Sequence, residues 1–224
     1  MELSGRRVVV VGSGGALGSG LVDAFTRAGA SVLGLNRIVR QAPGEGVELR
    51  AVDVSADAEL GQVFDSEPPP WAVVNTVGGF APRRPVSELD PVELDGQLRL
   101  NLVTAALITK HALRRLTETG EGRLVHTASR VAVEPTGAGF PYSVSKLGVV
   151  HLVRMAAAEV RGSRITVNCV MPSIIDTPAN RAALPHADHS SWPTVAEVAA
   201  AFVFLASPAA HLISGAAIPV YGRA

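Results

Sequence analysis

Two side chains with complementary proton chemistry stand one helical turn apart in this sequence. Tyr142 and Lys146 are four positions apart, so they share one face of the helix that we expect to begin near residue 142. A free phenol has a pKa of about 10 and is a poor base at neutral pH, but a nearby ammonium lowers that value. The chain has two tyrosines, and all but two of its 20 basic residues are Arg, so the pairing is informative. We therefore predict that Tyr142 exchanges a proton with a substrate oxygen.

Two further polar residues are candidates for the same site. Ser129 stands thirteen positions before Tyr142, just after an apolar run that ends at residue 127, and its hydroxyl could hold a substrate oxygen. Asn101 is an amide in an apolar helical stretch. Taken alone, the first is more simply a solvated loop serine and the second a surface amide. Their weight comes from their position relative to Tyr142 and Lys146.

A glycine-rich turn follows the first apolar run and precedes a helical pattern. Without β-carbons this backbone can turn tightly and approach a pyrophosphate, which would rest on the amide groups at the helix N-terminus. The simpler alternative is an ordinary turn between a strand and a helix. We predict a dinucleotide site made by Gly12, Ser13, Gly14, Ala16, Leu17 and Gly18.

The residues expected at the end of the second strand bear on the choice of dinucleotide. An acidic residue there would accept hydrogen bonds from the ribose hydroxyls of NAD, whereas a guanidinium would pair with the 2′-phosphate of NADP. The sequence has Asn36 and Arg37 at this point. This pattern favours NADP(H) over NAD(H), unless Arg37 is only a surface residue.

The elements that position these residues can be traced from the periodicity of apolar residues. Helical spacing is expected at 17–28, 55–64 (capped by Ser55), 91–116, 142–161 and 195–206, and strands at 6–11, 31–35, 47–52, 71–77, 123–127, 165–170 and 216–220. Continuously apolar strands separated by helices indicate a parallel sheet covered on both faces. We expect one α/β domain over residues 1–224, a Rossmann-type doubly wound sheet of about seven strands. Ligands then bind at the carboxyl ends of the strands.

Composition and charge argue against several other classes of protein. The 224 residues carry no net charge at pH 7, and no basic stripe could track a nucleic acid. The single cysteine, Cys169, cannot form an internal disulfide, and His186, Asp188 and His189 are better explained as polar loop residues than as metal ligands. The apolar runs are too short to span a membrane and no signal peptide is evident, so a cytoplasmic protein is expected.

In order and spacing, Asn101, Ser129, Tyr142 and Lys146 resemble the catalytic tetrad of the short-chain dehydrogenase/reductase family. The glycine turn is similar to the family's GxxxGxG pattern, with Ala16 in place of the middle glycine. Residues 75–78 resemble its Asn-Asn-Ala-Gly strand end, residues 172–177 its Pro-Gly-x-x-x-Thr loop, and residues 213–222 its C-terminal segment. The resemblance covers nearly the whole chain.

This resemblance implies hydride transfer between the dinucleotide and a carbonyl or alcohol substrate. Tyr142 would be the acid/base, Lys146 would hold the nicotinamide ribose and lower the tyrosine pKa, Ser129 would position the carbonyl, and Asn101 would hold a water that links Lys146 to solvent. Homodimers or homotetramers are the family's usual assemblies. Further cofactor contacts would come from Asp53, Val54, Asn75, Val77, Gly78, Pro172, Ile174 and Thr177.

The substrate is less constrained by the sequence. We expect substrate loops at roughly 78–90, 129–141 and 172–193, where Phe80, Phe140 and Trp192 offer flat apolar surfaces or merely cover the core. A narrower resemblance to dihydropteridine reductases, carried mainly by residues 176–192, would make the substrate a quinonoid pterin. Asn36, Phe80 and the complete tetrad depart from that branch. A regulator that binds NADP without catalysis is a further alternative, although such regulators usually lose the Tyr-Lys pair.

Overall fold

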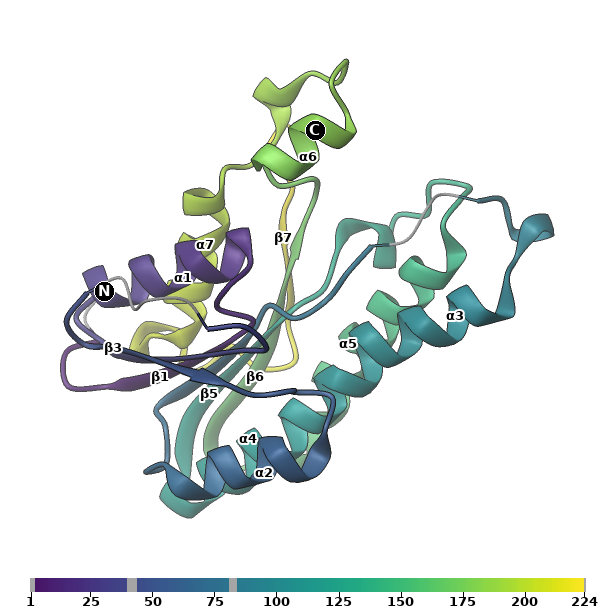
Figure 1. Ribbon diagram of the computed structural model, residues 1–224. Coiled ribbons are helices and arrows are strands. Elements are labelled where there is room, and N and C mark those ends of the chain that lie inside the picture. The colour runs from purple at the N-terminus through teal and green to yellow at the C-terminus, as the bar shows by residue number, and fades with distance from the viewer. Residues whose placement is uncertain (1–2, 40–43, 81–83, 224) are drawn as a thin grey trace.

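The computed structural model describes residues 3–39, 44–80 and 84–223 and has a seven-stranded, fully parallel sheet at its centre (Figure 1). The strand order is β3-β2-β1-β4-β5-β6-β7. The strands are β1 (Arg7–Val11), β2 (Ser31–Asn36), β3 (Val47–Ala51), β4 (Ala72–Asn75), β5 (Glu121–Thr127), β6 (Arg164–Pro172) and β7 (Ala217–Val220). The predicted doubly wound α/β fold is confirmed.

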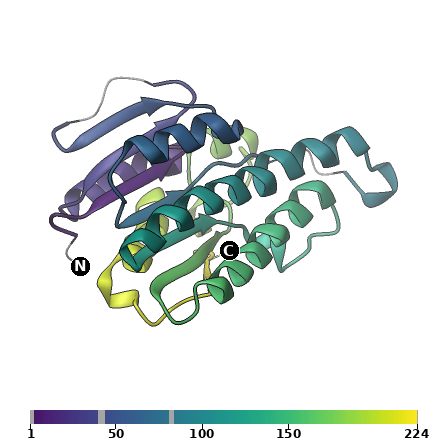
Figure 2. The ribbon, with the colours of Figure 1, turned by 90° about the horizontal axis from the view of Figure 1, so that it is seen from below.

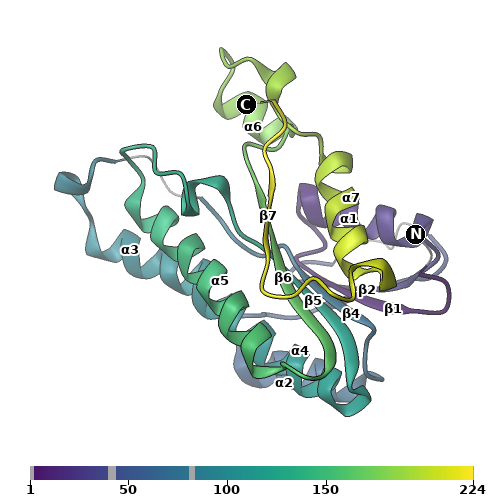
Figure 3. The same cartoon turned by 180° about the vertical axis from the view of Figure 1, so that it is seen from behind.

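Helices cover both faces of the sheet. On one face α2, α4 and α5 lie side by side (Figure 2), and on the other α1 packs beside α7 (Figure 3). The helices are α1 (Ala16–Arg27), α2 (Asp57–Ser66), α3 (Pro91–Gln97), α4 (Thr104–Thr119), α5 (Phe140–Glu159), α6 (Pro178–Ala183) and α7 (Val195–Ala206).

The valines of β1 are buried on both faces of the sheet, which explains why this strand is continuously apolar. Val9 and Val11 belong to the core on the α2–α4–α5 side, whereas Val8 and Val10 belong to the core on the α1–α7 side. Successive side chains of a strand point to opposite faces, so a strand covered on both faces needs apolar residues at every position. Each buried valine contributes roughly 1.5–3 kcal/mol relative to exposure.

The strand order reverses between β1 and β4, which are neighbours in the sheet although β2 and β3 follow β1 in the chain. The crevice outside the carboxyl ends of the strands at such a switch point is where open α/β sheets bind ligands. The turn after β1 and the turn after β4 therefore form the two walls of the expected site.

Several strands and helices end a few residues from the predicted positions, and three larger details differ from the sequence predictions. The predicted long helix at 91–116 is α3 and α4 separated by a π-helical turn, η2 (Leu98–Val103), and α4 continues to Thr119. Helix α2 begins at Asp57 with Ala56 at its N-cap, so Ser55 lies one position too early to cap it; the Ser55 hydroxyl donates to Asp53 Oδ1 at 2.6 Å. Helix α6, capped by the Thr177 side chain, was not predicted.

The last residues of the chain are bonded to the long loop between β6 and α7. The amide of Arg223 donates to Ser191 O at 2.9 Å, and a β-carbon at Gly222 would come within 2.5 Å of that same oxygen. The Ser173 hydroxyl donates to Tyr221 O at 2.8 Å. The C-terminus therefore lies beside α6 (Figure 1). Within the described part of the chain, no helix has the length and apolar character needed to cross a membrane.

Candidate active site

Lys146 lies in the first half of α5 and is almost completely buried, with 3% of its surface exposed. Its Nζ donates to the carbonyl oxygen of Thr127, at the end of β5, over 2.9 Å. Burial disfavours the charged form and lowers the pKa of Lys146 to about 8. The ammonium therefore persists at neutral pH but titrates within the range in which enzymes work.

Tyr142 lies one turn before Lys146, and burial raises the pKa of its phenol. A hydrogen bond with the Ser129 side chain acts in the opposite direction and is the weaker effect. The expectation that the pKa of Tyr142 lies below its usual value is therefore wrong, because the cost of desolvating the phenolate dominates. The neutral phenol is the form present at neutral pH.

Ser129 is buried and comes just after β5. The end of β5 positions both Ser129 and, through a backbone carbonyl, Lys146. The strand ends at Thr127, whose carbonyl oxygen receives Lys146, and Ser129 follows two residues later at the phenol of Tyr142. The structure brings Ser129, Tyr142 and Lys146 together from β5 and α5. The role of Thr127 was missed in the sequence because a backbone acceptor leaves no signal in residue type.

Asn101 lies in the π-helical turn η2, and its amide is fully engaged. Its Oδ1 accepts from Gly79 N at 3.1 Å, and its Nδ2 donates to Gly79 O and to Gln97 Oε1, each at 3.0 Å. Both amide hydrogens are used, so a water could bind only to oxygens of Asn101. The extra residue of a π turn, a feature frequent at functional sites, places this side chain inward.

Gly78 connects Asn101 with Lys146. A β-carbon at Gly78 would lie 2.6 Å from Asn101 Oδ1 and 2.8 Å from Lys146 Nζ, distances that real β-carbons do not show. A side chain at this position, in the turn after β4, would therefore force Asn101 and Lys146 to shift. Three predicted site residues are therefore close neighbours: Asn101 of η2, Gly78 of the turn after β4 and Lys146 of α5.

The glycine turn after β1 is shaped to approach a ligand closely. Gly12 has φ +88°, a left-handed conformation that favours glycine, and a β-carbon on Gly18 would collide with the carbonyl oxygen of Gly12. Helix α1 begins at Ala16, and no side chain caps its first amide groups. Ser13 is buried and Leu17 half-buried, while Gly14 is exposed. These features fit the pyrophosphate of a dinucleotide.

Thr76 is a residue of this region that the sequence reasoning missed. Its hydroxyl is 3.0 Å from Val11 O and 3.1 Å from Gly12 O, so it ties the end of β4 to the glycine turn. A β-carbon at Gly12 would lie 2.6 Å from this same hydroxyl. The only sequence signal was its position between Asn75 and Val77.

The cofactor residues predicted after the second and third strands lie at or just past the ends of β2 and β3. The Asn36 side chain stands against Gly14 and donates to Ile38 O at 2.8 Å, and Arg37 is exposed. Hydrogen bonds from Ser55 hold the pKa of Asp53 below its usual value, and the charge of Arg37 adds to this effect. Val54, in the same turn, is half-buried.

Three predicted cofactor residues follow β6. Pro172 is its last residue and is buried, Ile174 is half-buried, and Thr177 accepts from the amide of Asn180 as the cap of α6. The bridge between Asp176 and Thr194 closes the base of the loop that contains α6.

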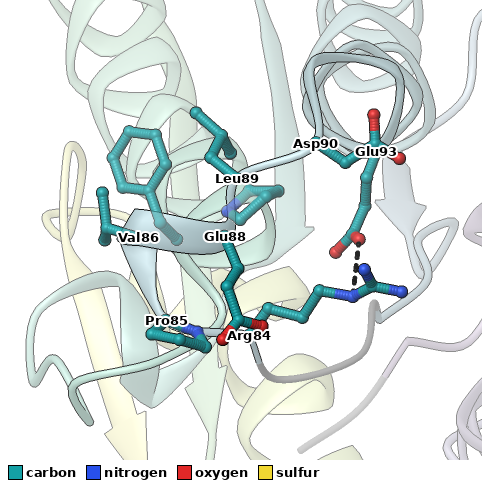
Figure 4. Close-up of a pocket in the computed structure, with 9 residues that line it drawn as sticks. Arg84, Pro85, Val86, Glu88, Leu89, Asp90 and Glu93 are labelled. Atoms are coloured by element: carbon teal, nitrogen blue, oxygen red, sulfur yellow. Dashed lines mark ion pairs between the residues drawn. The ribbon is translucent and has the colours of Figure 1, made fainter.

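The three aromatic candidates lie in different environments. Phe80 is 67% exposed and stands edge-on to Tyr142, with ring centroids 6.0 Å apart. Phe140 lines a shallow pocket, walled also by Val86, Leu89 and the Arg84–Glu93 ion pair (Figure 4). Trp192 is 7% exposed and packs on His189 within its own loop. Its burial favours the covering role over contact with substrate.

Two other predictions concern loops and metal ions. Residues 81–83 of the predicted substrate loop 78–90 lie outside the described residues. Among residues 3–39, 44–80 and 84–223 no group of three or more His, Cys, Asp or Glu side chains could hold a metal ion.

Comparisons with known proteins agree with this geometry. A family profile described as "Enoyl-(Acyl carrier protein) reductase" matches residues 12–222. Galactitol 2-dehydrogenase of Rhizobium johnstonii is 31% identical, covering 98% of this chain and 95% of its own, and cis-4-hydroxycyclohexanecarboxylate dehydrogenase of Sinomonas cyclohexanicum is 29% identical, covering 97% and 95%. A solved short-chain type dehydrogenase/reductase from Mycobacterium ulcerans is 26% identical, with a TM-score of 0.90 over 100% of this chain and 90% of that one.

The profile spans almost the entire chain, and both relatives are named dehydrogenases and match this chain over 95% of their own lengths. The chain thus belongs to the short-chain dehydrogenase/reductase family and is an NAD(P)-dependent oxidoreductase.

Proposed function

We propose that this protein interconverts a carbonyl and an alcohol with NADP(H) through Ser129, Tyr142 and Lys146. The observation that carries the proposal is the meeting of these side chains at the carboxyl end of β5, where Lys146 bonds to Thr127 O and Ser129 to the Tyr142 phenol. The glycine turn would hold the pyrophosphate, and Lys146 would hold the nicotinamide ribose. When bound, the dinucleotide supplies or accepts the hydride.

In the reductive direction Tyr142 acts as a general acid. Its raised pKa keeps the phenol protonated, so it can donate a proton to the carbonyl oxygen as that oxygen gains negative charge. Ser129 orients the same oxygen through its hydroxyl. The ammonium of Lys146 then stabilises the phenolate left on Tyr142.

The test of this mechanism compares the two tyrosines of the chain. Tyr142→Phe removes the proton donor and should lower kcat by about 10²–10⁴-fold, with the Kd for NADPH nearly unchanged. Tyr221→Phe is the matched control and should keep the activity of the parent, since the Tyr221 ring packs under Arg130 and its backbone oxygen makes its bond to Ser173. Near-normal turnover by Tyr142→Phe would refute the mechanism.

The preference for NADP(H) rests on Arg37 and on the absence of an acidic side chain at Asn36. Loss of a charge-assisted bond to the 2′-phosphate costs about 1.5–3 kcal/mol, so Arg37→Ala should raise KM for NADPH by roughly 10–100-fold and leave KM for NADH unchanged. Arg161→Ala, another exposed arginine, is the control. A parent enzyme that prefers NADH would contradict this assignment.

The substrate can be narrowed by a panel monitored at the NADPH absorbance band. The relatives are named for cyclohexane carboxylates and sugar alcohols, so ketones and alcohols of these classes form the first group. Quinonoid dihydropterin forms the second group, because Phe80 beside Tyr142 could stack on a planar ring. We expect turnover in the first group; turnover of the pterin alone would favour the dihydropteridine reductase alternative.

A further inference from the structure

A histidine without exposed surface lies in the middle of the sheet, beneath the candidate site. His126 belongs to β5, where it is in register with Asn75 of β4. Its Nδ1 is 3.1 Å from Asn75 Nδ2, and its Nε2 is 3.0 Å from the hydroxyl of Thr109 in α4. It links β5 and the central strand β4 to helix α4, which covers them.

The direction of each hydrogen bond in this group follows from its partners. The amide of Val77 can only donate, so the Asn75 atom 2.9 Å from it is the acceptor Oδ1, and the atom facing His126 is the donor Nδ2. Nδ1 of His126 must therefore accept, and Nε2 carries the hydrogen. Thr109 Oγ1 accepts from Nε2 and passes its own hydrogen to Ala105 O at 2.8 Å.

This chain of bonds leaves His126 one protonation state. A second proton on Nδ1 would face the amide hydrogens of Asn75, with the Lys146 ammonium also nearby. Burial, followed by the charge of Lys146, lowers the pKa of His126 to about 3. The ring is thus a fixed neutral spacer with one donor and one acceptor.

The hydrogen bonds around His126 also hold Asn75, the last residue of β4. Thr127 Oγ1 donates to Asn75 O at 2.7 Å and holds the Asn75 backbone, while His126 holds its side chain. Asn75 Oδ1 then fixes the amide of Val77, and the next residue is Gly78, where a β-carbon would lie 2.6 Å from Asn101 Oδ1 and 2.8 Å from Lys146 Nζ.

We propose that His126 is a positioning residue that aims the Asn75 side chain at the Val77 amide and thereby sets the cofactor-facing turn at Gly78. Its significance for catalysis rests on the proposed function, since Gly78 is a dinucleotide contact only as the family resemblance implies. The positioning itself is a property of the protein alone and can be measured without cofactor.

Two substitutions separate the halves of the histidine ring. In His126→Asn the side-chain oxygen can take the place of Nδ1 and still accept from Asn75, whereas in His126→Gln the amide nitrogen can take the place of Nε2 and still donate to Thr109. A purely structural role predicts similar losses in the two variants. The positioning role predicts that the turn from Val77 to Gly78 is disturbed only in the variant that lacks an acceptor at the Nδ1 position, which is His126→Gln.

The first measurement is amide hydrogen exchange at Val77, and the second is the Kd for NADPH. His126→Gln should speed Val77 exchange and raise the Kd, each by roughly tenfold, while His126→Asn stays within about threefold of the parent. Thermal unfolding identifies a variant that fails to fold; Asn75→Ala, which removes the acceptor for Val77 directly, should then reproduce the fast exchange.

Equal Val77 exchange in the Asn and Gln variants, or slow exchange in Asn75→Ala, would overturn the proposal. If the parent binds neither NADPH nor NADH, the proposed function fails, and the exchange measurement still decides whether His126 positions the turn.

Discussion

At the scale of single residues, burial acts in opposite directions on the two titrating side chains of the site. It raises the pKa of Tyr142, because the phenolate is the charged form, and lowers that of Lys146 to about 8, because the ammonium is. Both shifts favour the uncharged form of the side chain, so at mildly alkaline pH a neutral phenol and a neutral amine are both populated. In the proposed mechanism, reduction needs the protonated phenol and benefits from the charged lysine.

The pH dependence of reduction follows from these directions. Below pH 8 both proton-bearing forms are present, so kcat/KM should be level; through about pH 8 Lys146 loses its charge, and kcat/KM should fall. A profile of the free enzyme from about pH 6 to about pH 10 checks this. A reductive rate that rises through pH 8 would contradict it, because the ammonium would then oppose the reaction.

At the scale of elements, the site depends on how closely α1 approaches the turn that precedes it. A β-carbon on Gly18 would collide with the backbone at Gly12 and Ser13, whereas one on Gly15 would lie 3.6 Å from the nearest such atom, an ordinary contact. Gly15 thus has room for a side chain and Gly18 does not, although they stand three positions apart in one glycine-rich segment.

Gly18→Ala should therefore displace α1, destabilise the protein by about 1–3 kcal/mol and weaken dinucleotide binding. Gly15→Ala is the control and should bind nearly as the parent does. Denaturant unfolding and a fluorescence titration with NADPH measure the two effects. Equal affinities in the two variants would show that the α1 contact does not shape the site.

The elements also show which features a sequence can reveal. The seven strands, the glycine turn and the Tyr142–Lys146 pair were predictable because each is a local pattern of residue types. The π turn at Asn101, the bond from Thr76 to the glycine turn and the pairing of His126 with Asn75 were not, because each depends on a neighbour brought close by the sheet. Ser55 was predicted as a cap because its residue type fits, but the helix begins at Asp57, which puts Ala56 at the N-cap.

At the scale of the whole molecule, large apolar side chains remain exposed along η2 and α5. Leu100, Val103, Leu147 and Met155 are 37–58% exposed, on elements that pack against each other. Patches of this kind often mark interfaces between copies of a chain. This supports the homodimer or homotetramer that we propose for the assembly.

Light scattering of the parent should accordingly give twice or four times the mass of one chain. The double substitution Leu147→Glu and Met155→Glu places charge on the exposed face of α5 and should lower that mass, since a buried unpaired charge is strongly unfavourable. A parent that is monomeric at assay concentrations would refute the proposed assembly.

The two ends of the chain differ in what can be attached to them. Leu3 is bonded to Ala28 at the amino-terminal edge of the strands, whereas Arg223 is bonded to Ser191 in the loop that stands above their carboxyl ends. A tag, fusion partner or solid support that follows Arg223 would start at the loop beside the site, but one that precedes Leu3 would start at the opposite edge. An enzyme tethered through its N-terminal side would keep the carboxyl ends of the strands, where the candidate site lies, facing the solution.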